Sequence, residues 1–102
     1  MLLITDLNSK QRSFLTGESH DLNPLVHVGK EGISEGVVDQ TSETLKDHEL
    51  IKVRINDNAP VNAEESAEII SRRTSSEVVQ IIGSVIILYK ENPDDPQYNL
   101  PN

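Results

Sequence analysis

The chain has 102 residues and no cysteine, which suffices for one domain and excludes disulfides, thiol catalysis and zinc sites built on thiolates. Its 9 Lys and Arg against 17 Asp and Glu give a formal net charge of −8, which argues against a nucleic-acid binder held by long-range attraction. No apolar run has the length of a membrane span, and the N-terminus lacks the basic region of a signal peptide, so a soluble cytoplasmic protein is expected.

The first predicted element is a helix, preceded by a short lead-in over residues 1–7. Asn8 fits the N-cap of this helix, and Gln11 stands at the spacing of a capping box. Apolar residues then recur at helical intervals. Asn23-Pro24 ends the helix, because the residue before a proline is disfavoured in the α conformation.

A short apolar strand, Leu25 to Val28, leads into the loop Gly29-Lys30-Glu31-Gly32 and then into a helix from Glu35 to His48. Ser34 fits the N-cap of that helix. Glycines permit a close approach, and unpaired N–H groups at the positive end of a helix dipole attract anions. We therefore interpret the loop as a phosphate contact with Lys30 as a mobile positive charge, although the same pattern is typical of a tight connection without a ligand.

The next predicted strand, Leu50 to Ile55, alternates between apolar and basic residues. Because successive side chains of a strand point to opposite faces, Lys52 and Arg54 share one face and the apolar residues share the other. One face of this strand is therefore predicted to be core, and the other to be wet and basic.

A third helix and two strands complete the predicted domain. Asn62 fits the N-cap of the helix, which ends near Thr74. The strands Val78 to Ile82 and Val85 to Tyr89 are joined by Gly83-Ser84, which predicts a hairpin with a type II′ turn. Their almost continuous apolar character indicates either burial on both faces or a dimer edge.

The predicted order is helix, strand, helix, strand, helix, strand, strand. Such alternation indicates an α/β protein with a mixed four-stranded sheet and helical crossovers. One domain is expected to span residues 8–90. Residues 91–102 are acidic and hold three of the five prolines, which predicts a disordered tail.

Several blocks of sequence occur together in a characteristic order. They are Ser9-Lys10-Gln11-Arg12, Leu22-Asn23-Pro24, Val28 to Ile33, His48 to Arg54, and Val79 to Gly83 before Leu88-Tyr89-Lys90. These blocks resemble the YhbY family, the stand-alone bacterial form of the CRM domain, which is named for chloroplast RNA splicing and ribosome maturation. The resemblance covers about Leu7 to Lys90.

The resemblance implies a two-layer α+β fold similar to the C-terminal domain of translation initiation factor three, with an added N-terminal helix. It implies RNA binding and association with precursors of the large ribosomal subunit. It also implies that the loop Gly29-Lys30-Glu31-Gly32 contacts RNA much as the equivalent loop of KH domains does. Basic positions of the family are matched on the first helix and the second strand by four residues: Lys10, Arg12, Lys52 and Arg54. At Thr16, where family members commonly carry a basic residue, this chain has a hydroxyl.

Two functional hypotheses from different classes follow. In the first, the protein is an RNA-binding assembly factor that contacts ribosomal RNA or pre-ribosomal particles mainly through phosphates, since only three residues are aromatic. In the second, it is an interaction module whose acidic segment Asp39 to Glu49 docks on basic ribosomal proteins. An enzyme, a metal and a cofactor are not expected, because His20, His27 and His48 fall in no catalytic or metal-binding pattern.

Overall fold

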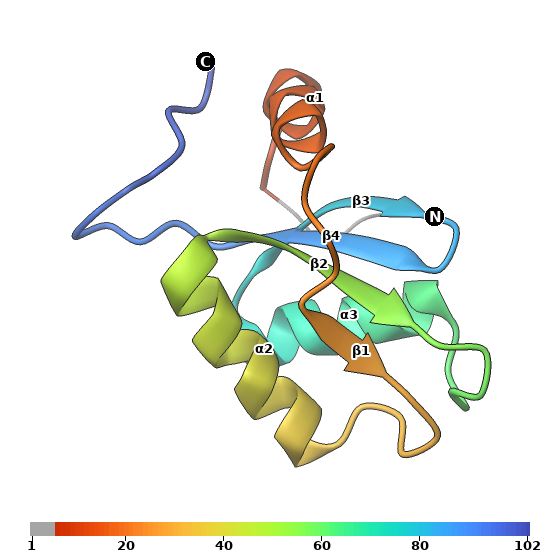
Figure 1. Ribbon diagram of the computed structural model, residues 1–102. Coiled ribbons are helices and arrows are strands. Elements are labelled where there is room, and N and C mark those ends of the chain that lie inside the picture. Colours follow the sequence, from red (N-terminus) through yellow and green to blue (C-terminus); the bar gives the residue numbers. More distant parts are fainter. Residues whose placement is uncertain (1–5) are drawn as a thin grey trace.

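A mixed four-stranded sheet separates one helix from the other two (Figure 1). The computed structural model describes residues 6–102, so the predicted lead-in lies outside the described residues except for Asp6 and Leu7. The elements follow one another as α1 (Ser9–Glu18), β1 (Val26–Val28), α2 (Glu35–His48), β2 (Leu50–Ile55), α3 (Ala63–Thr74), β3 (Glu77–Ile82) and β4 (Val85–Tyr89). This order and the mixed sheet confirm the predicted fold class.

The strands lie in the order β1-β2-β4-β3. The helix α2 carries the chain from β1 back to a parallel β2, and the register places Val26 opposite Val53. The other two pairs are antiparallel, so β4 lies between β2 and β3. A β-bulge interrupts the pairing of β3 with β4 between Val78 and Gln80.

The main core lies between the sheet and the helices α2 and α3. Alternate residues of β2 point into it, as the sequence predicts: Ile51, Val53 and Ile55 are buried there. Leu45 of α2 and Ile70 of α3 belong to the same cluster. Since alternation along a strand is strict, Lys52 and Arg54 must point to the opposite face.

A smaller core lies on that opposite face, where α1 covers one end of the sheet (Figure 1). Leu15 of α1 is fully buried and packs in one cluster with Leu50, Ile87 and Tyr89. The strand β4 therefore contributes to both cores. Of the two explanations for the apolar hairpin strands, burial on both faces holds for β4 within a single chain.

The helix starts follow the predicted capping residues. Asn8 and Gln11 form a reciprocal capping box on α1, and the side chains of Ser34 and Asn62 accept hydrogen bonds from the first turns of α2 and α3. The end of α1 differs from the prediction, because the helix stops at Glu18 rather than continuing to Asn23-Pro24. Backbone hydrogen bonds after Glu18 form turns instead of a further helical turn.

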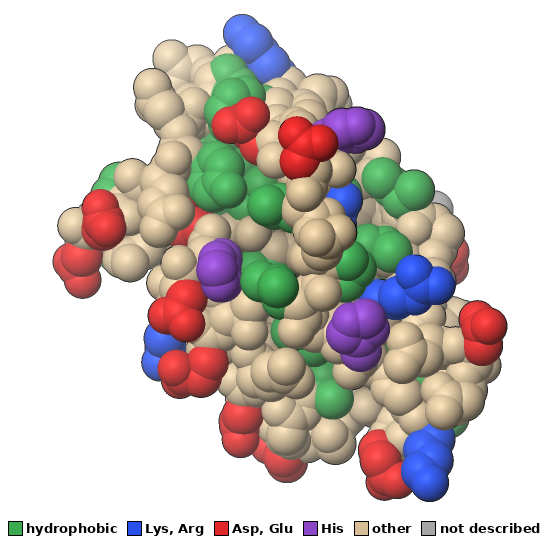
Figure 2. Space-filling view, viewed as in Figure 1, with side chains coloured by type: hydrophobic (Ala, Val, Ile, Leu, Met, Phe, Trp, Pro, Cys, Tyr) green, Lys and Arg blue, Asp and Glu red, His purple; other side chains and the backbone are tan. Residues whose placement is uncertain are grey.

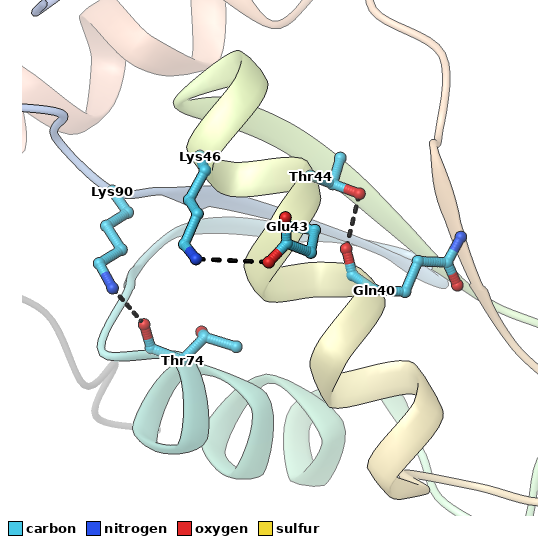
Figure 3. Close-up of polar contacts among 6 residues, drawn as sticks. All are labelled: Gln40, Glu43, Thr44, Lys46, Thr74 and Lys90. Carbon is cyan, nitrogen blue, oxygen red and sulfur yellow. Dashed lines mark hydrogen bonds and ion pairs between the residues drawn. The ribbon is translucent and has the colours of Figure 1, made fainter.

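Figure 3 shows polar contacts within α2 and at the end of α3. The hydroxyl of Thr44 donates to the carbonyl oxygen of Gln40 at 2.7 Å, which satisfies a side chain that is otherwise unfavourable in a helix. Lys90 Nζ donates to the carbonyl oxygen of Thr74 at 2.9 Å. Because Thr74 is the last residue of α3, this ammonium group meets the negative end of the helix dipole.

The C-terminal segment, residues 91–102, has neither helix nor strand, but it packs against the smaller core. The N–H of Gln97 donates to the buried carboxylate of Glu49 at 2.9 Å, and the ring of Tyr98 meets that of Tyr89 edge-on at 6.3 Å. Leu100 also contacts the cluster. The segment is therefore packed, whereas its composition predicts a disordered tail. The reason is that two apolar side chains near its end, Tyr98 and Leu100, pack on the edge of the smaller core.

Replacing Tyr98 by Ala is expected to lower the free energy of unfolding by about 1–2 kcal/mol, because it removes the ring pair and the half-buried surface of the ring. The neighbouring Asn99 is exposed, so Asn99→Ala is expected to change the free energy by less than about 0.5 kcal/mol. Urea unfolding measures both. Equal effects would show that the segment is not packed.

Burial raises the pKa of Tyr89 from 10.0 to about 12, and the negative charge of Glu49 adds to the effect. A raised pKa favours the protonated, folded form, so this contribution is complete below pH 10 and is lost as the pH rises through 10 toward 12. Relative to Tyr89→Phe, the wild type should therefore lose stability in that range and not below it. Urea unfolding of both proteins across the range measures the difference; a constant difference would contradict the burial of the hydroxyl.

Candidate nucleic-acid interface

The face of the sheet that carries Lys52 and Arg54 is only partly covered. The smaller core occupies the end where Leu50 and Tyr89 pair, and α1 lies over it. At the other end the register aligns one cross-strand row of four side chains: His27, Arg54, Val85 and Ile82. His27, Arg54 and Ile82 are exposed, and Ile82 retains 56% of its accessible surface. This row and Lys52 are hereafter called the open sheet face.

Apart from Lys90, which donates to the end of α3, the basic side chains divide into two groups. Within residues 6–102, ion pairs form only at Lys46, Arg72 and Arg73, all on α2 and α3, where acidic residues neutralise them locally. The short pair between Arg73 and Glu35 raises the pKa of that guanidinium. The five predicted basic positions form no ion pair in the same part of the chain: Lys10, Arg12, Lys30, Lys52 and Arg54.

The two predicted residues on α1 differ in their surroundings. Lys10 is exposed. Arg12 is half-buried at the seam between α1 and β3, where its Nε donates to the carbonyl oxygen of Val79 at 3.2 Å. This carbonyl belongs to the bulge of β3, so the bulge fixes the direction of the guanidinium.

The loop Gly29-Lys30-Glu31-Gly32 forms a tight turn at the end of β1. The N–H of Gly32 donates to the carbonyl oxygen of Gly29 at 2.9 Å, and the N–H of Ser34 donates to that of Gly32 at 3.1 Å. The prediction of unpaired amides is therefore wrong for Gly32. For the amides of Lys30 and Glu31, no acceptor is found in residues 6–102, and both side chains are exposed.

Only one of the two glycines is required by the backbone. Gly32 has a φ of 67°, in the left-handed region, and a Cβ there would lie 3.2 Å from Cγ of Pro60. Gly29 has no such φ, and its nearest neighbour would be Oδ1 of Asn58 at 3.9 Å. The turn 56–60 thus supports the loop from one side, and the N–H of Asn56 ties it to β1 through the carbonyl oxygen of Val28.

The surface charge follows the same division. In Figure 2 the side chains over α2, at the lower left, are mostly Asp and Glu, whereas over the strands and the loop, at the right, Lys, Arg and His side chains appear alongside Asp and Glu. All three aromatic rings of the chain, Phe14, Tyr89 and Tyr98, belong to or contact the smaller core. The open sheet face therefore offers charge and aliphatic surface but no Phe or Tyr ring, and the exposed imidazole of His27 is its one ring on which a base could stack.

Neither a metal centre nor a membrane span appears among residues 6–102. No group of three or more potential ligands (His, Cys, Asp or Glu) comes close enough to hold a metal ion. None of the helices described has the length and apolar character needed to cross a bilayer.

Beside Arg12 the structure brings together four residues that were not predicted as ligands: Ser9, Ser13, Thr16 and Gln80. Their meeting depends on the packing of α1 on β3, for which the sequence gives no direct signal.

The comparisons with known proteins agree with this architecture. The model of the CRS1 / YhbY (CRM) domain matches residues 7–90. This chain belongs to that family. The match extends from the residue before the N-cap of α1 to the residue after β4, so it includes every helix and strand described above.

Several known proteins are similar to almost the whole chain. The Bacillus subtilis protein YqeI, named a probable RNA-binding protein, is 38% identical over 93% of this chain and 99% of its own length. A Haemophilus influenzae protein named RNA-binding protein is 36% identical over 96% and 98%. The solution structure of a Staphylococcus aureus protein proposed to bind RNA superimposes with a TM-score of 0.80 at 39% identity, covering 93% of this chain and 99% of that one.

Replacing Gly32 by Ala is expected to lower the free energy of unfolding by about 1–2 kcal/mol, because a left-handed φ costs a residue with a Cβ that much. The matched variant Gly29→Ala needs no such conformation and is expected to leave the free energy unchanged or to raise it by up to about 1 kcal/mol. Urea unfolding compares the two. Equal losses would contradict the assignment of the strained position to Gly32.

Proposed function

We propose that the protein is an RNA-binding factor in the assembly of the large ribosomal subunit, and that it contacts RNA through the loop of residues 29–32, the open sheet face and the start of α1. The observation that carries the proposal is the division of the basic residues. Cations on α2 and α3 are neutralised by ion pairs, whereas the five predicted positions on α1, β2 and the loop of residues 29–32 form none in residues 6–102. The names of the similar proteins support RNA as the ligand.

The contacts are expected to be mainly with phosphates. The amides of Lys30 and Glu31 have no acceptor in residues 6–102 and lie before the N-terminus of α2, and Lys30 adds a mobile charge. Lys52 and Arg54 provide further charge on the open sheet face. If the site neutralises about 3–5 phosphates, the logarithm of the binding constant should fall with the logarithm of salt concentration with a slope of roughly −2 to −4. Recognition then depends on shape and backbone more than on base identity.

The net charge of −8 sets the conditions for this binding. Long-range attraction is weak, so a pre-formed ribonucleoprotein particle in the cytoplasm is a better target than naked RNA. The acidic side of the molecule would then face away from the RNA. Docking on ribosomal proteins through the acidic segment Asp39 to Glu49 is the alternative, but within that segment Glu43 is already paired with Lys46 and Glu49 is buried.

The charge reversal Lys30→Glu is expected to weaken binding to a fluorescent transcript of large-subunit precursor RNA by about tenfold, because it places a carboxylate in the phosphate path. Lys46→Glu on α2 changes the net charge equally and, since its exposed ion pair with Glu43 contributes little, should leave affinity within about twofold. Fluorescence anisotropy at fixed salt measures both.

Two results would count against the proposal. Equal losses for the two variants would mean that only net charge matters and that the loop is not the contact. Sedimentation with precursor particles that persists after RNase treatment, and that is lost when Asp39 and Asp47 are replaced by Asn, would favour docking on ribosomal proteins instead.

A further inference from the structure

A polar hollow lies between α1 and β3, next to the open sheet face. It is lined by six residues: Ser9, Arg12, Ser13, Thr16, Val79 and Gln80. Three of them carry hydroxyl groups and lie on one side of α1, since their spacing is four and then three residues. In a chain with 17 acidic residues, the lining contains no carboxylate.

Within residues 6–102, all but one of the side-chain donors named here are not used by the protein itself. Arg12 donates to Val79 through Nε, and its two terminal NH2 groups have no acceptor within residues 6–102. In the same part of the chain, the side chains of Ser13, Thr16 and Gln80 form no hydrogen bond, although Thr16 and Gln80 are half-buried. A guanidinium held by a backbone carbonyl, beside free hydroxyl and amide donors, matches the acceptor oxygens of a phosphate.

The hollow is also continuous with the predicted RNA path. In the register of the sheet, Gln80 lies opposite Ile87, and Ile87 lies opposite Lys52. Gln80 and Lys52 therefore stand in one row on one face, two strand spacings or about 10 Å apart. Ile87, which lies between them, is a buried residue of the smaller core, so a nucleic-acid backbone that contacts Lys52 and Arg54 would cross β4 along the neighbouring open row of Val85 and Ile82 and enter the hollow from there.

We infer that the hollow between α1 and β3 binds one backbone phosphodiester of the RNA, with Arg12 as the charged ligand and Gln80, Ser13 and Thr16 as neutral donors. This inference rests on the proposed function, because it assigns a second anchoring point to the same RNA. The loop of residues 29–32 anchors one end of the path, and the hollow anchors the other.

The test compares two isosteric substitutions in the full chain. Gln80→Glu adds a carboxylate to the hollow, and Gln40→Glu adds the same charge to the exposed face of α2. Binding of the fluorescent precursor transcript is measured over a range of salt concentrations. Gln80→Glu should weaken binding about five- to tenfold and make the salt slope shallower by about 0.7, the value for one phosphate contact on a single strand. Gln40→Glu should change affinity by less than about twofold and leave the slope unchanged.

A gain of affinity provides a result that misfolding cannot imitate. Thr16→Arg places a second guanidinium in the hollow and should strengthen binding about threefold or more, with a steeper salt slope.

Inorganic phosphate, added as a competitor at constant ionic strength, separates a site for free phosphate from one for the RNA backbone. If millimolar phosphate does not displace the transcript from the wild type, the result supports a site for the phosphodiester. Displacement by millimolar phosphate would show a site for free phosphate and would overturn the inference.

The outcomes distinguish the inference from the proposed function. If Lys30→Glu weakens binding but Gln80→Glu and Thr16→Arg have no effect, the RNA path does not enter the hollow and only the inference fails. Equal weakening by Gln80→Glu and Gln40→Glu also overturns it. If the wild type binds neither the transcript nor precursor particles, the proposed function fails, and the inference fails with it.

Discussion

The strict alternation of β2 determines where the positive charge of this protein lies. Its apolar residues are buried under α2 and α3, so Lys52 and Arg54 must occupy the opposite face. A shift of the register by one residue would bury both cations and expose the core residues, which the packing of two helices forbids. The position of the basic surface is therefore a consequence of how the main core is packed.

The second determinant is the incomplete cover of the opposite face. The short helix α1, with ten residues, covers only the end of the sheet where Leu50 and Tyr89 pair, and the C-terminal segment fills the margin beside it. The rest of that face remains open between α1 and the loop at the end of β1. At this loop Gly32 has a left-handed φ, and a Cβ added there would come within 3.2 Å of Cγ of Pro60. The closed turn stands beside the open basic face.

Much of the fold could be predicted from the sequence, because the patterns that determine helices, strands and turns are local. Capping residues and hydrophobic periodicity gave α2 and β2 with their observed bounds, and the positive φ of Gly83, at 59°, agrees with the predicted hairpin turn. The fold class and the family are likewise confirmed. The roles of the individual RNA-contacting residues stay predictions.

The parts that the sequence did not predict depend on contacts between distant segments. The C-terminal segment packs through Tyr98 and Leu100 on a core margin that exists only after α1 has docked. The hollow beside Arg12 depends on the bulge of β3, for which no residue pattern provides a signal. The hydrogen bond from the N–H of Gly32 to the carbonyl oxygen of Gly29 closes the turn. The amide of Gly32 is therefore not among the unpaired amides that the loop sequence predicts.

The central claim is that RNA occupies the side of the sheet opposite α2 and α3. Backbone amide chemical shifts of the isotopically labelled protein, recorded while RNA is added at constant salt, test it most directly. We expect the largest shifts at Lys30 and Glu31, along Lys52 to Arg54 and at the start of α1, with the exposed turns of α2 and α3 unchanged. The account is contradicted if the shifts concentrate on the acidic surface of α2.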